Sequence, residues 1–147
     1  MSITRFPPNS VWLGGDRTVV NDIAASEAIT PGMLVERFNA AGVIRFRKST
    51  ETDKAGFQIA TEQSMLNLGV DDDYAANDLV ESSLGHNGST WWCLIGSGAN
   101  LAAGDKLGNA GNGKLKAVGG GIAIATAIEN KDNSAGPGDA RIRVEVI

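Results

Sequence analysis

The chain has 147 residues, a formal net charge of −4, 19 glycines and 5% aromatic residues. This length corresponds to one domain that can bury a core without a metal ion, and the single cysteine, Cys93, excludes an intrachain disulfide. The acidic balance, with basic residues dispersed along the chain, argues against a protein that binds duplex nucleic acid. Many glycines and few aromatic residues are typical of an all-β protein with many turns.

The first 27 residues differ in pattern from the rest. A Pro-Pro pair and a Gly-Gly pair predict that they lack regular structure. Disordered tails are poor in bulky apolar residues, so we expect an extended arm over 1–27 that occupies a groove on its own domain or on a neighbour. A β-rich domain over 28–147 follows, and deletion of residues 2–13 should leave it folded. The arm residues expected at an interface with the partner are Phe6, Pro7, Pro8, Val11, Trp12 and Leu13.

Three short segments, 29–35, 74–80 and 101–107, share one pattern. Each has an apolar residue, two spacers, Gly or Asn, two more residues, and then Val or Leu. Gly32, Asn77 and Gly104 occupy the shared position, and Gly and Asn enter positive φ most readily. The pattern predicts three tight turns that each lead into a strand.

From residue 28 onward the apolar residues recur with a period of two, which predicts strands over 43–48, 57–62 and 140–147. In the last strand, Ile142, Val144 and Val146 are expected to face the core. Residues 121–128 alternate bulky with small side chains and carry no charge, which indicates a strand buried on both faces. Only residues 61–68 have the pattern of a helical turn.

The pair Trp91–Trp92 lies in an apolar run that reads as a strand. Because neighbouring residues on a strand point to opposite faces, only one of the two enters the same core. The other is expected to face a covering segment or a partner subunit. Both tryptophans are candidate interface residues.

Three sequence motifs that resemble catalytic or metal sites lack essential parts. Residues 108–114 have the spacing of a phosphate-binding loop, but Leu115 stands where Mg²⁺ coordination needs Ser or Thr, so a hairpin turn is expected. Residues 71–73 are three consecutive aspartates and predict a solvated turn. One histidine, His86, and one cysteine, Cys93, make a poor nucleophile–base pair. We therefore expect no enzyme activity, no cofactor and no metal.

The start of the sequence has no signal-peptide pattern, and no apolar run approaches the roughly 18 residues of a membrane span. We expect a soluble product made in the cytoplasm, with no membrane partner.

Taken in order, residues 74–118 run through a turn, a strand, a second turn, a glycine-rich hairpin and another strand. The small-residue segment 121–130 and the alternating last strand follow, and the hairpin over 29–46 fits the same order. This order resembles the capsid decoration, or cement, proteins of tailed bacteriophages over about residues 28–147. The resemblance implies an all-β fold, a compact β-barrel or β-sandwich (β-tulip-like), with an extended N-terminal arm.

The resemblance also implies a function. Such proteins are structural virion proteins that bind the outer surface of the capsid and clamp neighbouring major capsid subunits. The implied partners are the major capsid protein and other copies of this chain, with a homotrimer favoured over a dimer, and no catalytic residue or cofactor. One alternative is a carbohydrate- or receptor-binding β module on a virion, with Trp91 or Trp92 as a stacking platform. The other is a nucleotide-dependent enzyme, against which Leu115 counts.

Overall fold

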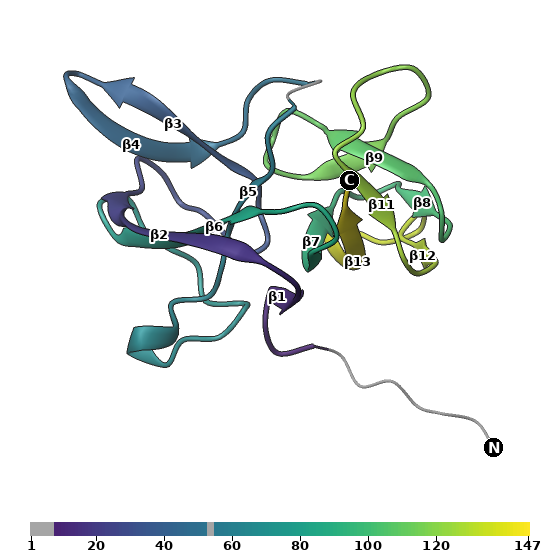
Figure 1. Cartoon of the computed structure of the whole chain (residues 1–147), viewed down its shortest axis with the longest axis horizontal. Helices are drawn as coiled ribbons and strands as arrows, with labels where there is room; N and C mark the ends of the chain where they lie inside the picture. Colours follow the sequence, from purple (N-terminus) through teal and green to yellow (C-terminus); the bar gives the residue numbers. More distant parts are fainter. Residues whose placement is uncertain (1–7, 53–54) are drawn as a thin grey trace.

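The computed structural model describes residues 8–52 and 55–147, and its strands form two regions that lie side by side (Figure 1). The first region is a closed barrel of five strands in the order β7-β10-β9-β11-β13, which closes because β13 pairs back onto β7. All neighbours are antiparallel except β10 and β7. The barrel strands are β7 (Thr90–Ile95), β9 (Lys106–Asn109), β10 (Leu115–Ala117), β11 (Ala125–Ala127) and β13 (Ala140–Val146).

The second region, which we call the outer sheets, has a three-stranded sheet in the order β2-β6-β5 and a separate hairpin, β3–β4. Its strands are β2 (Arg17–Ala24), β3 (Val35–Ala40), β4 (Val43–Lys48), β5 (Gln58–Ala60) and β6 (Leu79–Gly85). The remaining elements are β1 (Trp12–Gly14), the pair β8 (Asn100–Leu101) and β12 (Lys131–Asp132), and the 3₁₀ turn η1 (Ser64–Leu66). The prediction of a compact all-β fold with a barrel is confirmed.

The barrel core follows the period of two that the sequence predicts. Ile142, Val144 and Val146 of β13 are buried, as expected. Trp91 of β7 is fully buried and packs on Phe57 with 5.9 Å between ring centroids. Side chains from every strand of the barrel fill its interior, so it has a packed core rather than an open lumen.

A second apolar cluster lies within the outer sheets and includes Ile29, Phe46 and Tyr74. Neighbouring residues of one segment point into different cores, since Ile59 enters the barrel core and Ala60 enters the second cluster. Strand β7 does the same, because Leu94 points away from the barrel into the second cluster. The two regions therefore share strands and pack as one unit.

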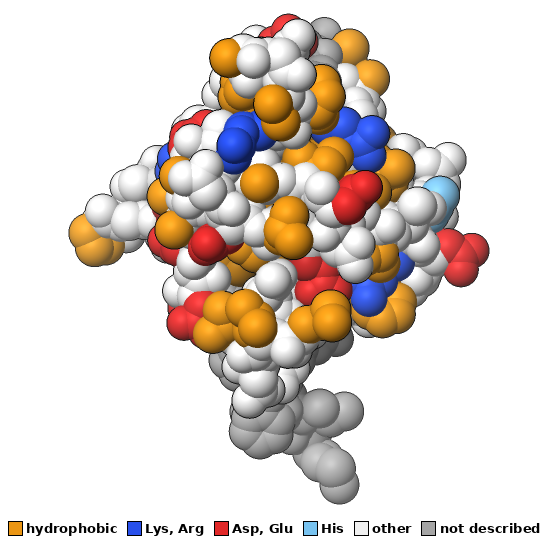
Figure 2. Space-filling model, turned by 90° about the vertical axis from the view of Figure 1, so that its left-hand side faces the viewer, with side chains coloured by type: hydrophobic (Ala, Val, Ile, Leu, Met, Phe, Trp, Pro, Cys, Tyr) orange, Lys and Arg blue, Asp and Glu red, His pale blue; other side chains and the backbone are white. Residues whose placement is uncertain are grey.

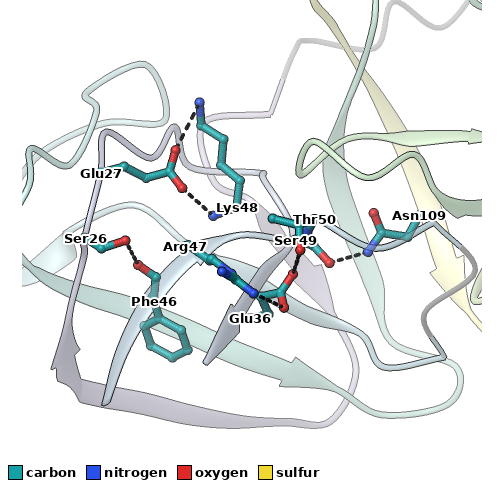
Figure 3. Close-up of polar contacts among 9 residues, drawn as sticks. All are labelled: Ser26, Glu27, Glu36, Phe46, Arg47, Lys48, Ser49, Thr50 and Asn109. Atoms are coloured by element: carbon teal, nitrogen blue, oxygen red, sulfur yellow. Dashed lines mark hydrogen bonds and ion pairs between the residues drawn. The ribbon is translucent and has the colours of Figure 1, made fainter. Parts of the chain in front are cut away.

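Polar contacts join the base of the β3–β4 hairpin to the barrel (Figure 3). The side-chain amide of Asn109 in β9 donates a hydrogen bond to the Ser49 hydroxyl. The buried carboxylate of Glu36 points toward Thr50 and Arg47, accepting from the Thr50 backbone and hydroxyl groups and from Arg47 Nη2 at 3.4 Å. Buried polar groups are stabilising only when they are paired. The Asn109–Ser49 bond therefore fixes the hairpin on the barrel, and the Glu36 contacts hold the base of the hairpin together.

Residues 108–114 form the β9–β10 hairpin turn, as predicted, and this turn packs against the outer sheets. The Leu34 amide donates to the Gly113 carbonyl at 2.7 Å, and the Gly113 amide donates to the Ser49 carbonyl at 3.2 Å. Lys114 forms an ion pair with Asp139 at 2.8 Å. The lysine is thus engaged within the chain, and no helix follows the turn to hold a phosphate.

All three repeated segments form the turns that the sequence predicts. Gly32, Asn77 and Gly104 have φ values of +99°, +76° and +96°, and each turn leads into a strand, β3, β6 and β9 respectively. Two of the turns are closed in the same way, because Asp78 and Asp105 each accept a hydrogen bond at 2.9 Å from the backbone amide three residues before. The first and last apolar residues of every repeat are buried.

The expectation that residues 1–27 lack regular structure is wrong for the part from Pro8 onward. Strand β1 pairs with β7 and strand β2 pairs with β6 over most of its length. Gly15, at φ +87°, makes the turn between β1 and β2, so the glycine pair redirects the chain instead of ending its structure. The outer edge of β7 has free backbone groups at this end, and β1 satisfies them.

The expectation for residues 121–128 also needs correction. Only Ala125–Ala127 of the segment 121–128 is a strand, and Ile122 and Ile128 at its ends are 45% and 40% exposed. The segment is not buried on both faces throughout, because β9 and β13 cover only its centre. On β4, Phe46 is buried but Ile44 is 52% exposed, since the hairpin extends beyond the second core.

Candidate functional site

The two adjacent tryptophans point to opposite faces of β7, as predicted. Trp91 has no exposed surface, whereas Trp92 is half-buried on the outside of the barrel. Arg143 of β13 lies directly across the sheet from Trp92, and the guanidinium of Arg141 lies 5.1 Å from the centre of its ring. Trp92 is therefore the one of the pair whose position allows contact with a partner.

Arg141 organises the surface around Trp92. Its Nη1 donates to the Pro31 carbonyl at 2.8 Å, and its Nη2 donates to the Val70 carbonyl at 2.7 Å and lies 3.6 Å from the Asp71 carboxylate. Burial lowers the pKa of Arg141, and the negative charge of Asp71 opposes this change. The arginine thus fixes two loops of the outer sheets against the barrel.

A hollow of about 270 Å³ opens beside Trp92. Its wall includes Pro8, at the start of the described chain, and the charged side chains of Glu129, Lys131 and Arg143. Arg143 Nη1 donates to the Glu129 carboxylate at 2.6 Å, so part of this charge is paired within the chain. Two of the residues predicted for an interface, Pro8 and Trp92, are brought together here.

The other predicted interface residues separate into three groups. Val11 and Trp91 are fully buried in the barrel core, so the expectation that they contact a partner is wrong. The physical reason for Val11 is that its backbone bonds to Trp92 and to the Glu62 carboxylate hold the segment against β7. Trp12 is 36% exposed with Arg17 stacked 4.1 Å from its ring, and Leu13 is partly exposed. Phe6 and Pro7 lie outside the described residues.

A second surface was not identified from the sequence. Around η1, the side chains of Met65, Leu66, Leu68 and Leu79 are 88%, 65%, 41% and 54% exposed. Three of them, Leu66, Leu68 and Leu79, line a groove of about 350 Å³, which we call the η1 groove. Figure 2 faces the outer sheets and shows hydrophobic side chains exposed beside Asp and Glu side chains in its lower half. The helical-turn pattern over 61–68 predicted η1, but it gave no signal of which residues stay exposed.

The cysteine, the histidine and the carboxylates of the described chain lie in positions that do not favour nucleophilic catalysis or metal binding. Burial raises the pKa of the Cys93 thiol well above its ordinary value of 9.0, and a protonated buried thiol is a poor nucleophile. His86 is exposed, with Nε2 2.9 Å from the Thr18 hydroxyl. In the described part of the chain, no group of three or more His, Cys, Asp or Glu side chains is arranged to hold a metal ion.

The aspartates at 71–73 are exposed, as the solvated-turn prediction requires. Among residues 8–52 and 55–147, no helix has the length and apolar character needed to cross a membrane.

No protein-family model and no curated protein matches the chain. Among solved structures, the chain is similar to the N base of the head fiber gp8.5 of bacteriophage phi29. The two chains share 10% sequence identity and superpose with a TM-score of 0.60 over 90% of this chain and 95% of that one. At this identity the likeness shows the fold, and it does so over nearly the whole of both chains.

Proposed function

We propose that the chain is a structural protein of a bacteriophage virion that binds the outer surface of the capsid and cements neighbouring capsid subunits. The observation that carries the proposal is the fold shared with the N base of a phage head fiber over nearly the full length of both chains. The turn-and-strand order of capsid decoration proteins points to the same class independently. The proposed role is that of a binding surface, and it requires neither catalysis nor a cofactor.

The distribution of exposed apolar groups supports attachment. A protein that clamps subunits needs contact area repeated by symmetry more than it needs reactive groups. The outer sheets expose Val43 and Ile44 at the β3–β4 hairpin and Leu66 and Leu79 at the η1 groove. In this proposal the hairpin side chains are buried against the shell and the groove side chains against another copy, and the homotrimer belongs to it.

The test is the binding of the purified chain to purified capsids that lack decoration. We expect saturable binding with a fixed number of copies per capsid, and a rise in the temperature at which the shells break. Capsids already saturated with the unlabelled chain are the matched control and should take up no labelled chain. Absence of saturable binding contradicts the proposal.

The carbohydrate-binding alternative is less well supported by the geometry. Trp91 has no exposed surface on which a sugar ring could stack, and Trp92 has Arg141 against its ring. A glycan titration that follows tryptophan fluorescence separates the two functions. A saturable change that is lost in Trp92→Ala would favour the alternative.

A further inference from the structure

The η1 groove exposes apolar side chains that contribute nothing to the chain's own core. The turn η1 has no buried residue, and Met65 beside the groove is 88% exposed. The floor is rigid, because the Tyr74 hydroxyl donates to the Thr61 carbonyl at 2.6 Å and accepts from the Glu81 amide at 3.2 Å. A contiguous apolar surface on a fixed floor is typical of a binding site for another chain.

The rim of the groove is acidic, and this charge limits what can bind. Asp72 and Asp78 each accept a hydrogen bond from a backbone amide three residues earlier, at 2.6 and 2.9 Å, and so shape the rim. Among the described residues, Asp73 has no hydrogen bond or ion pair, and its charge is free to act on an occupant. The groove therefore fits a segment that combines bulky apolar side chains with a positive charge.

The chain itself contains such a segment. Residues 3–6, Ile-Thr-Arg-Phe, supply two bulky apolar side chains and one arginine with no acidic residue, and they lie outside the described part of the chain. The position from which they depart is fixed, because Ser10 Oγ and the Val11 amide donate to the Glu62 carboxylate at 2.7 and 3.0 Å. Charge and apolar character are thus complementary between this segment and the groove.

We propose that residues 3–6 of one copy bind in the η1 groove of a neighbouring copy. The described part of the chain begins at Pro8, which lines the hollow beside Trp92 and Lys131, whereas the groove is lined by Asp72 and Asp73 of the turn that Arg141 holds through the Val70 carbonyl. Arg5 would face Asp73, and Ile3 and Phe6 would cover the leucines. A contact between two different surfaces gives a ring when its rotation closes, as a homotrimer requires. This inference rests on the self-association within the proposed function and gives it a contact.

Disulfide trapping tests the contact directly, since the natural Cys93 is buried and unreactive. The double variant Phe6→Cys/Leu68→Cys, oxidised in dilute solution, should give covalent dimers and higher species on a non-reducing gel. The matched control, Phe6→Cys/Ile44→Cys, places the second thiol on the β3–β4 hairpin at a site of similar exposure and should give few. An internal crosslink within one chain, or equal crosslinking in both variants, overturns the proposal.

A charge exchange gives a second, independent test. Arg5→Glu and Asp73→Lys should each weaken self-association at least tenfold in sedimentation experiments, and the combined variant should recover most of the loss. Because Asp73 is exposed, Asp73→Lys should leave the unfolding temperature unchanged in samples dilute enough to be monomeric. Failure of the combined variant to recover, or a native chain that is monomeric at all concentrations, overturns the inference. Capsid binding of the same samples is scored separately, so loss of the arm contact with retained capsid binding leaves the proposed function standing.

Discussion

The barrel and the outer sheets differ in how completely their backbone groups are paired and their apolar side chains are buried within the chain. The barrel closes on itself, and β1 covers the part of β7 that β10 leaves open, so its backbone groups are paired and its core is filled. The edges of the outer sheets are only partly paired, through isolated bridges such as Ala25 with Phe46 and Leu34 with Ile59. Together with the segment around η1, the outer sheets expose most of the large apolar side chains found outside the cores. Open edges and exposed apolar groups are where proteins associate.

The comparison indicates which region contributes most to stability and which region carries the surface used in the proposed function. The barrel strands contribute mainly to folding, whereas the outer sheets combine a small core of their own with exposed apolar surface, which the proposed function assigns to partners. The two regions are nevertheless joined by shared segments and by the Ser49–Asn109 contact. A substitution in either core should therefore change the free energy of unfolding of the whole chain.

The largest losses of stability are expected from substitutions that remove a large side chain from either core. Trp91→Ala in the barrel and Phe46→Ala in the second cluster should each reduce the free energy of unfolding by about 3–5 kcal/mol, because both side chains are fully buried. Fluorescence reports on the barrel side, where Trp91 and Trp92 lie, while circular dichroism reports on both regions. Coincident denaturant curves for Phe46→Ala are expected from one cooperative unit. Loss of circular dichroism before fluorescence would show that the outer sheets unfold alone.

Two truncations distinguish the N-terminal residues that stabilise the barrel from those that do not. Deletion of residues 2–13 removes the buried Val11 and strand β1, and should cost about 1.5–3 kcal/mol or more of unfolding free energy. The sequence predicts that the domain stays folded after this deletion, and the buried Val11 adds that its stability should be lower. Deletion of residues 2–7 is the control and should leave the thermal midpoint unchanged. Equal midpoints for the two deletions would contradict the role of Val11.

Alkaline pH should destabilise both regions, through a different group in each. Burial is the main cause that raises the pKa of Cys93 in the barrel above 9.0 and that of Tyr74 in the outer sheets above 10.0. The folded state then keeps protons that the unfolded state releases, so stability is fully present below about pH 9 and falls as the pH rises. Each group contributes a slope of up to about 1.4 kcal/mol per pH unit.

Substitution of each residue shows which part of the pH dependence comes from Cys93 and which part from Tyr74. Unfolding free energies measured from pH 7 to 11 should show a smaller alkaline loss for Cys93→Ala from about pH 9 and for Tyr74→Phe from about pH 10. A native curve that is flat up to pH 11 would contradict the burial of both groups.

The smallest effects on stability are expected at the exposed apolar positions of the outer sheets. Leu66→Ser at the η1 groove and Ile44→Ser on the hairpin should change the unfolding free energy by no more than about 0.5 kcal/mol, since both side chains are more than half exposed. Their effects on self-association should differ, with Leu66→Ser weakening the contact between copies and Ile44→Ser leaving it intact. A large loss of stability in Leu66→Ser would mean that this side chain supports the fold.

The local features of the fold could be predicted from the sequence because they depend on local rules. Positive φ at Gly32, Asn77 and Gly104 follows from residue type, and the inward face of β13 follows from strand alternation. The opposite orientations of Trp91 and Trp92 follow from the same alternation.

The path of the N-terminal segment could not be predicted, because it depends on pairing with distant strands. Gly15 permits both a disordered tail and a turn, and only the free edge of β7 selects the turn. The η1 groove also lacked a signal, since the pattern over 61–68 predicts a helical turn without indicating which of its apolar residues stay exposed. Their exposure results from how far the second core extends.

The central claim is that this chain attaches to the outside of a phage capsid, and capsid binding tests it most directly. The labelled native chain should sediment with undecorated capsids up to a fixed stoichiometry, and cryo-electron microscopy of the saturated particles should show added density on their outer surface. Binding that never saturates, or added density only inside the shell, would contradict the account.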